Sequence, residues 1–108
     1  MPHALGEFEQ LILLALVRLG DEAYGVSIQE EIGRRTRRAV SPGAVYKTLL
    51  RLEAKGLVAS WVGEPTRRRG GRRKKHYRLS AAGAQELRRS TAALRGMTRG
   101  LAPTLELP

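Results

Sequence analysis

The sequence of 108 residues contains no cysteine and few large aromatic residues: one Trp, one Phe and three Tyr. The absence of cysteine excludes disulfide bonds, thiolate metal sites and a cysteine nucleophile. The two histidines, His3 and His76, are too few and too isolated to predict a metal site. The remaining residues do not supply a nucleophile with a base and an orienting group. We therefore expect a protein that is not an enzyme and that has no cofactor.

The chain also has no long apolar run. The longest, residues 11–17, is far too short to span a bilayer. The first ten residues, MPHALGEFEQ, do not have the basic start of a signal peptide. We therefore expect a cytoplasmic protein with no membrane partner, folded as one small domain.

Acidic residues are scarce in the second half of the chain. Residues 1–54 carry seven basic and seven acidic side chains, whereas residues 55–108 carry thirteen basic and three acidic ones. The net charge of +10 therefore arises entirely from the second half. A charge of this size and uneven distribution predicts a polyanionic partner.

The hydrophobic pattern predicts helices at about residues 5–19, 24–35, 42–55 and 81–100, and strands at about 57–64 and 75–79. Ser41 and Pro42 are typical of a helix N-cap and first helical residue. This order predicts a mainly α fold with a small β-hairpin, arranged as a winged helix-turn-helix. We expect a DNA-binding domain at residues 5–79, a C-terminal dimerisation helix at 80–101 and a tail at 102–108.

The third predicted helix has two contrasting faces. Val45, Leu49 and Leu52 fall on one narrow arc and are assigned to the core. The opposite face is small and cationic, which suits a helix in the major groove, and the residues expected to contact DNA are Ser41, Gly43, Ala44, Lys47, Thr48 and Arg51. An ordinary amphipathic helix would show the same two faces, and this helix taken alone favours that interpretation.

The neighbouring basic segment reverses that judgement. Seven of the nine residues from 67 to 75 are cationic, and the other two are glycines. Like charges this dense repel one another unless an anion neutralises them. Contact with the phosphate backbone or with a narrow minor groove is therefore predicted for Arg67, Arg68, Arg69, Arg72, Arg73, Lys74 and Lys75. The alternatives are a basic loop without defined contacts and a localisation signal, but a position between two strands favours nucleic acid.

Apolar residues at both ends of the chain predict self-association. The first helix is apolar nearly all round, which indicates burial on more than one side, and Leu87, Leu94 and Leu101 recur every seven residues. The residues expected at a homodimer interface are Leu5, Phe8, Leu13, Leu87, Leu94, Met97 and Leu101. The alternative is packing of the last helix on the first helix of the same chain.

The ordered set of motifs resembles the PadR-like transcriptional regulators. Its landmarks are Leu11-Ile12-Leu13, Tyr24-Gly25, the segment SPGAVYKTLLRLEAKGLV and the segment GGRRKKHYRLSAAG. The resemblance implies a homodimer joined through the first and last helices, and a repressor of a palindromic operator. It also implies that Tyr46 contacts the DNA backbone, that Tyr24 and Tyr77 support the helix and the wing, and that a small hydrophobic or aromatic effector binds between subunits.

Two other functions explain part of the sequence. An RNA- or ribosome-associated protein would account for the charge equally well, but it would not need a capped third helix with a small cationic face. A protein-interaction module using the apolar first helix would make the charge incidental, and it would bind DNA weakly and without salt dependence. Double-stranded DNA remains the partner that the sequence favours.

Overall fold

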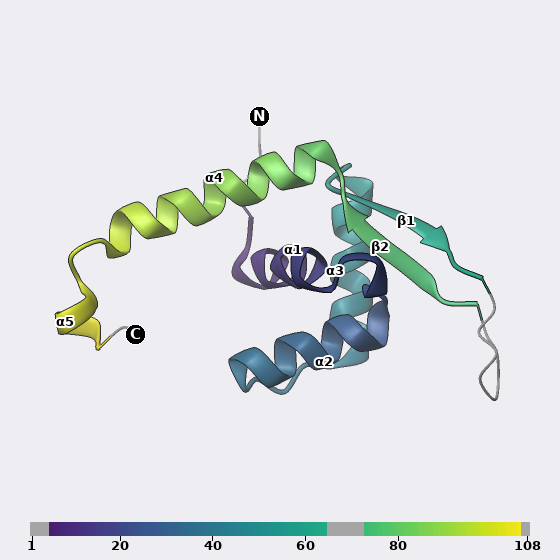
Figure 1. Ribbon diagram of the computed structural model, residues 1–108, viewed down its shortest axis with the longest axis horizontal. Helices are drawn as coiled ribbons and strands as arrows, with labels where there is room; N and C mark the ends of the chain where they lie inside the picture. Colours follow the sequence, from purple (N-terminus) through teal and green to yellow (C-terminus); the bar gives the residue numbers. More distant parts are fainter. Residues whose placement is uncertain (1–4, 65–72, 107–108) are drawn as a thin grey trace.

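The protein is mainly helical, with one small sheet (Figure 1). The computed structural model describes residues 5–64 and 73–106. Its elements are α1 (Glu7–Leu19), a short 3-10 turn η1 (Gly20–Glu22), α2 (Gly25–Thr36), α3 (Pro42–Ala54), β1 (Val58–Val62), β2 (Lys75–Leu79), α4 (Ala81–Thr98) and α5 (Ala102–Leu105). The predicted fold class, mainly α with a β-hairpin, is confirmed.

Helix α1 forms the centre of the molecule and contacts α2, α3, α4 and β2. Ile12, Leu13 and Leu16 are buried on it, because neighbours pack on several of its sides. The nearly continuous apolar surface of this helix is thus largely covered within one chain. Leu14 and Val17 stay exposed.

Helix α3 begins and ends where its sequence indicates. The hydroxyl of Ser41 accepts a hydrogen bond from the backbone N–H of Ala44 at 3.1 Å, and Pro42 occupies the first turn, where no N–H is needed. Gly56 follows the helix with a φ of +76°, in the left-handed region that glycine adopts without strain. Val45, Leu49 and Leu52 are buried, as predicted.

The two strands form an antiparallel hairpin, or wing, that is attached to the turn before α2. Val58 pairs with Leu79 and Val62 with Lys75. The N–H of Tyr77 donates to the carbonyl oxygen of Ala23 at 2.9 Å, and an isolated bridge joins Tyr24 to His76. These contacts fix the base of the wing against the helices.

His76 adds a second attachment at the same place. Its ring stacks on Trp61 of β1 with centroids 5.3 Å apart, and its Nδ1 lies 2.9 Å from the carbonyl oxygen of Asp21. Trp61 is therefore part of the packing at the base of the wing.

Helix α4 is packed at its start and free at its end. Ser80 caps it through a 3.0 Å hydrogen bond from the N–H of Gly83, and Leu87 is buried against the body. Every residue from 92 to 100 is exposed, and this half of α4 extends beyond α1, α2 and α3 (Figure 1). The short helix α5 lies in the segment expected as a tail, where Pro103 suits a first helical turn.

Candidate nucleic-acid interface

The exposed side chains at the start of α3 are small or cationic, and none of them is acidic. Gly43, Ala44 and Lys47 are exposed, and the first turn of the helix contains no acidic residue. Tyr46 is exposed on the neighbouring side of the helix. An N-terminal helix end of this kind directs backbone N–H groups and a partial positive charge outward, which favours an anion such as a phosphate.

Thr48 is buried, unlike the other candidate DNA-binding residues on α3. Only 4% of its surface is exposed, because the residue lies beside the core positions Val45 and Leu52 on the helix. Its side chain belongs to the interior of this chain. We therefore leave Thr48 out of the interface.

Arg51 is directed towards α1 by a buried carboxylate. Glu9, which is 6% exposed, accepts hydrogen bonds from the N–H of Gly6 and from Lys55 Nζ, both at 2.9 Å, and from Arg51 Nε at 3.4 Å. Burial alone would raise the pKa of Glu9, but these hydrogen bonds and the charge of Lys55 outweigh it and lower that pKa. The cluster joins the end of α3 to the start of α1.

Sequence reasoning did not single out Glu9. A signal was present, because Glu9 has helical spacing with Ile12, Leu13 and Leu16, all of which are buried. A carboxylate on the buried face of a helix needs a cationic or hydrogen-bonding partner. Its partners, Arg51 on α3 and Lys55 directly after that helix, lie 42 and 46 residues away, and their identity could not be read from the local pattern.

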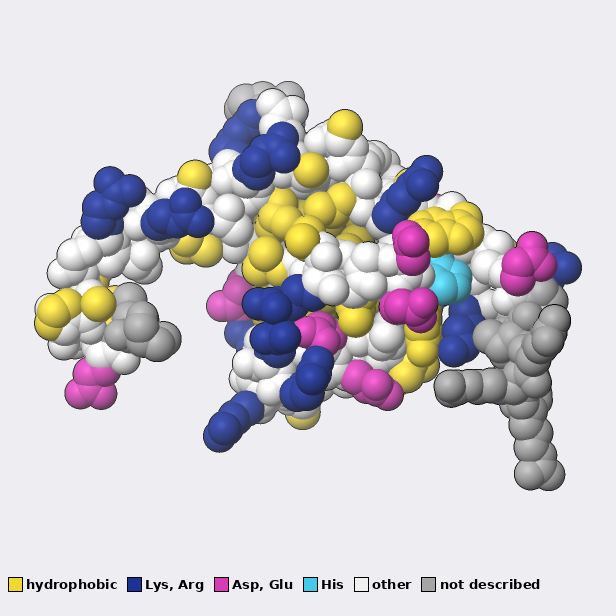
Figure 2. Space-filling model, viewed as in Figure 1, with side chains coloured by type: hydrophobic (Ala, Val, Ile, Leu, Met, Phe, Trp, Pro, Cys, Tyr) yellow, Lys and Arg dark blue, Asp and Glu magenta, His cyan; other side chains and the backbone are white. Residues whose placement is uncertain are grey.

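Three cations lie exposed at the loop end of β2: Arg73, Lys74 and Lys75. Lys74 Nζ lies 4.1 Å from the centre of the Tyr24 ring, and Lys75 Nζ lies 3.7 Å from Glu53 Oε1. Arg67, Arg68, Arg69 and Arg72 lie outside the described residues. On the face shown in Figure 2, Lys and Arg side chains are also spread along α4 and around α2 in the lower part of the view.

Two tyrosines, one on α3 and one on the wing, lie in different environments. Tyr77 on β2 is buried, and this burial, followed by the negative charge of Glu53 and the neighbouring Tyr46, raises the pKa of Tyr77. Tyr46 is 55% exposed, so its ring is accessible from solvent. The position of Tyr77 suits support of the wing, and that of Tyr46 suits contact with a partner.

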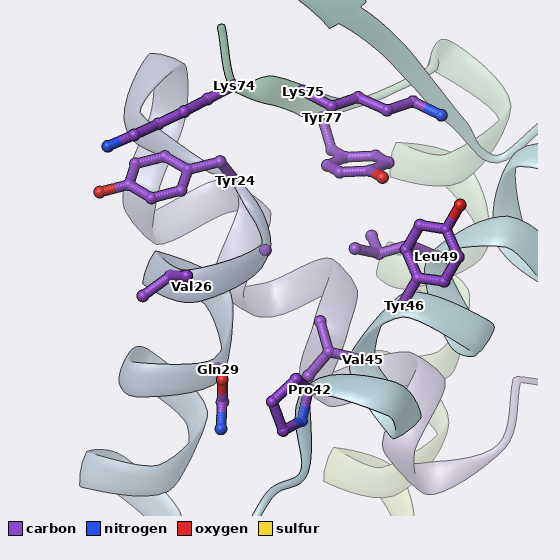
Figure 3. Close-up of a pocket in the computed structure, with 11 residues that line it drawn as sticks. Tyr24, Val26, Gln29, Pro42, Val45, Tyr46, Leu49, Lys74, Lys75 and Tyr77 are labelled. Carbon is purple, nitrogen blue, oxygen red and sulfur yellow. The ribbon is translucent and has the colours of Figure 1, made fainter. Parts of the chain in front are cut away.

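A groove of about 520 Å³ separates α2, α3 and β2. Figure 3 shows Lys74 over Tyr24 and Lys75 beside Tyr77 along one rim, with Val26 on α2 and Pro42 and Val45 on α3 across the groove. The groove thus adjoins both the start of α3 and the cationic loop end of β2.

The residues expected at a dimer interface fall into three groups. Leu13 and Leu87 are buried in the core of this chain, so they have no surface to offer a partner and we leave them out. Leu5 and Phe8 are partly buried against that core. Leu94, Met97 and Leu101 are exposed on and after the free half of α4.

The described residues hold no cluster of three or more His, Asp or Glu side chains that could bind a metal. Within the same part of the chain, no helix has the length and apolar character needed to cross a membrane.

Three helices, of which the third is capped and exposed at its start, and a two-stranded wing that is cationic at its loop end define a winged helix-turn-helix protein. The chain belongs to the family described as "Transcriptional regulator PadR-like family", whose profile matches residues 13–89. Members of this family are DNA-binding regulators of transcription and not enzymes. The predictions of the family and of a non-enzymatic protein are therefore confirmed.

Known proteins resemble the chain in sequence and in structure. Transcriptional regulator Rv3488 of Mycobacterium tuberculosis (strain ATCC 25618 / H37Rv) is 38% identical over 79 residues, which are 73% of this chain and 69% of that protein. A PadR family transcription regulator from hypervirulent Clostridium difficile R20291 superposes with a TM-score of 0.76 at 28% identity, covering 93% of this chain and 99% of the other. A PadR family regulator from Eggerthella lenta DSM 2243 gives 0.66 at 27% identity, covering 94% and 88%.

Proposed function

We propose that this protein is a homodimeric repressor that binds a palindromic operator, with α3 in the major groove and the wing on the phosphate backbone or in the minor groove. One observation carries the proposal. The start of α3, where the exposed side chains are small and none is acidic, lies beside the same groove as the exposed cations Arg73, Lys74 and Lys75. A duplex on this side would meet a helix end and a cationic strand together.

The start of α3 supplies the groups that would read sequence. Gly43 and Ala44 allow the helix to approach base edges closely, and Lys47 can donate to the acceptors of a guanine in the major groove. Tyr46 is exposed next to Lys47 and is assigned to the phosphate backbone. Ser41 fixes the first turn through the hydrogen bond that its Oγ accepts from the N–H of Ala44, and the other N–H groups of that turn are suited to a phosphate.

The wing supplies affinity that does not depend on sequence. Arg73, Lys74 and Lys75 are exposed at the loop end of β2, and the sequence places Arg67, Arg68, Arg69 and Arg72 directly before them. Contacts from such cations to phosphates position a protein on DNA and release counterions. Arg51 has a smaller part in this proposal than its sequence position suggests, because Glu9 holds it towards α1.

The free half of α4 supports a dimer. Leu94, Met97 and Leu101 are 53%, 77% and 40% exposed, although each is large and apolar. A second copy of the same helix would remove them from water. A symmetric dimer carries two copies of α3 related by a twofold axis, and such a pair matches two half-sites of opposite orientation.

The test is fluorescence anisotropy with the duplex upstream of the protein's own gene, compared with a scrambled duplex over a range of salt concentrations. We expect tighter binding to the native duplex and a linear fall of log K with log salt, with a slope of about 0.9 for each phosphate contact. Equal binding to both duplexes together with tighter binding to a structured RNA would overturn the proposal. Absence of binding at low salt would overturn any nucleic-acid function.

A further inference from the structure

Glu9 on α1 contacts a cation on the exposed side of α3. We propose that Glu9 withholds Arg51 from DNA phosphates, and that it thereby limits the affinity of α3 for duplexes of any sequence. The part of this proposal that concerns DNA rests on the function proposed above, whereas the restraint on Arg51 concerns the chain alone.

Three cations follow one another along one side of α3. Lys47, Arg51 and Lys55 are spaced by four residues, and this spacing places them in a row on a helix. Lys47, the residue proposed to read bases, is exposed, and the side chain of Arg51 is 54% exposed. Arg51 lies one helical turn after Lys47, or about 5.4 Å along the axis, so an extended arginine there is within reach of the same duplex.

Two of these three cations are already paired with a carboxylate. Glu9 Oε2 lies 2.9 Å from Lys55 Nζ and 3.4 Å from Arg51 Nε. Within the part of the chain that the structure describes, no carboxylate is paired with Lys47. The side chain of Glu9 is only 8% exposed and also accepts from the N–H of Gly6. The carboxylate is therefore fixed in position, and the arginine must leave it in order to reach another anion.

A second acceptor holds Arg51 back along its own helix. Arg51 Nη2 lies 3.5 Å from Oγ1 of Thr48, which is buried three residues earlier on α3. With Nε on Glu9 and Nη2 on Thr48, the guanidinium is held against the helices that carry it. A phosphate must displace both contacts to bind this group, so it gains less from Arg51 than from an unpaired arginine.

The charge of Glu9 also weakens the attraction of this region for a polyanion. Burial would raise the pKa of Glu9, but its hydrogen bonds and the charge of Lys55 lower it below the ordinary value of 4.5, so the carboxylate is ionised at neutral pH. One carboxylate therefore offsets part of the charge of two cations at the end of α3. Removal of this carboxylate should make Arg51 available to phosphates.

The test compares the wild type, Glu9→Gln, Arg51→Ala and the double variant in the anisotropy assay described above. Glu9→Gln should bind the native and scrambled duplexes about two- to five-fold more tightly, by the same factor, because phosphates are common to both. Its salt slope should steepen by about 0.9, the value for one additional phosphate contact. Arg51→Ala alone should weaken binding less than about two-fold, and the double variant should lose the gain of Glu9→Gln.

Glu86→Gln is the matched control for charge. Glu86 on α4 accepts a 3.0 Å hydrogen bond from Arg89, so this substitution also releases an arginine and adds the same net charge, but on a helix outside the proposed interface. We expect its affinity for both duplexes to stay within about two-fold of the wild type. An equal gain in Glu9→Gln and Glu86→Gln would show a general effect of net charge and would overturn the proposal.

A measurement on the wild type checks the restraint without any loss of stability. The NMR signal of the Arg51 Nε–Hε group should keep its position when the scrambled duplex is added to the wild type, and it should shift when the duplex is added to Glu9→Gln. A shift in the wild type, together with a several-fold loss of affinity in Arg51→Ala, would show that Arg51 contacts phosphates while Glu9 is in place. That result would overturn the proposal.

Fluorescein-labelled heparin, a polyanion without bases, separates this proposal from the proposed function. Glu9→Gln should bind heparin more tightly than the wild type, and the gain should disappear in the double variant. If the wild type binds no duplex at low salt, the proposed function fails, and heparin still decides whether Glu9 withholds Arg51. Equal heparin affinity in the wild type and Glu9→Gln, or a gain that persists without Arg51, would overturn the restraint. A gain confined to the native duplex would overturn the assignment to phosphates, because Arg51 would then contact bases.

Discussion

The carboxylate of Glu9, near the start of α1, lies 2.9 Å from the Nζ of Lys55, directly after α3. The two residues are 46 positions apart in the sequence. Glu9 is almost completely buried, whereas the side chain of Lys55 is 31% exposed. The charge that is removed from water is therefore mainly that of the Glu9 carboxylate. The cations that pair with this carboxylate hold the end of α3 against α1.

Replacing this carboxylate should destabilise the fold. For Glu9→Gln we expect a loss of about 1–2 kcal/mol in the free energy of unfolding at pH 7, because the charged hydrogen bonds are lost while the cations stay partly solvated. Urea unfolding followed by circular dichroism measures the change. Glu7→Gln is the control: Glu7 is exposed and pairs with Arg38 on the surface, so its loss should cost less than about 0.5 kcal/mol.

The same contact predicts a pH dependence. The pKa of Glu9 in the folded protein lies below its ordinary value of 4.5, so its stabilising contribution is complete above pH 4.5 and is lost as the pH falls through the folded pKa. The stability difference between wild type and Glu9→Gln should therefore shrink as unfolding is repeated at progressively lower pH below 4.5. A difference that stayed constant with pH would show that the carboxylate acts through its shape and not its charge.

Two glycines on α4 should respond in opposite directions to the same substitution. A Cβ on Gly83 would lie 2.0 Å from the carbonyl oxygen of Leu57, which is backbone and cannot rotate away. We expect Gly83→Ala to lower stability by about 2–4 kcal/mol. Gly96→Ala meets open space and should raise stability by about 0.5–1 kcal/mol, since alanine favours a helix. Thermal unfolding of both variants gives the comparison.

Mutations should distinguish the residues that contact bases from those that contact phosphates. Lys47→Ala should reduce the discrimination between native and scrambled duplexes by about 1–3 kcal/mol. Arg73→Ala should weaken binding to both duplexes alike and lower the salt slope by about 0.9. Anisotropy titrations over a range of salt concentrations measure both quantities. The reverse pattern would mean that the wing reads the sequence and α3 the backbone.

A charge placed in the exposed apolar half of α4 should weaken dimer formation. Leu94→Asp places a charge among the exposed apolar residues of that segment, and it should raise the dimer dissociation constant at least ten-fold, or about 1.4 kcal/mol. Sedimentation equilibrium measures this change, with far-UV circular dichroism as the check on folding. Val62→Asp changes a similarly exposed valine on β1 and should leave association unaffected. A monomeric wild-type protein would contradict the dimer directly.

The fold was predictable because its boundaries are encoded locally. Ser41 and Pro42 start α3 with a cap and a restricted φ, and Gly56 ends it with a left-handed conformation. The strand 75–79 was predicted with its observed bounds. Each of these signals acts within a few residues, so it can be read before the tertiary structure is known.

The exposure of individual side chains was less predictable. Thr48 lies only about 40° around α3 from the core residue Leu52 at 100° per residue, so helical spacing could not decide whether it faces the interior. Leu13 was expected at a subunit interface because α1 has so much apolar surface, and Leu87 because it recurs with Leu94 and Leu101 every seven residues. In the structure α1 is surrounded by α2, α3, α4 and β2, an arrangement that depends on chain connectivity and not on the pattern of any one helix.

The attachment of the wing has an evolutionary consequence. The hydrogen bond from the N–H of Tyr77 to the carbonyl oxygen of Ala23 and the contact of His76 Nδ1 with the carbonyl oxygen of Asp21 hold β2 against the turn before α2, and the stack of His76 on Trp61 joins β2 to β1. Because these contacts lie before residue 64 or after residue 73, insertions and substitutions between the strands can accumulate without moving α3. Under the proposed binding mode, descendants of this protein can therefore change the contacts of the wing with flanking DNA while α3 keeps its own contacts.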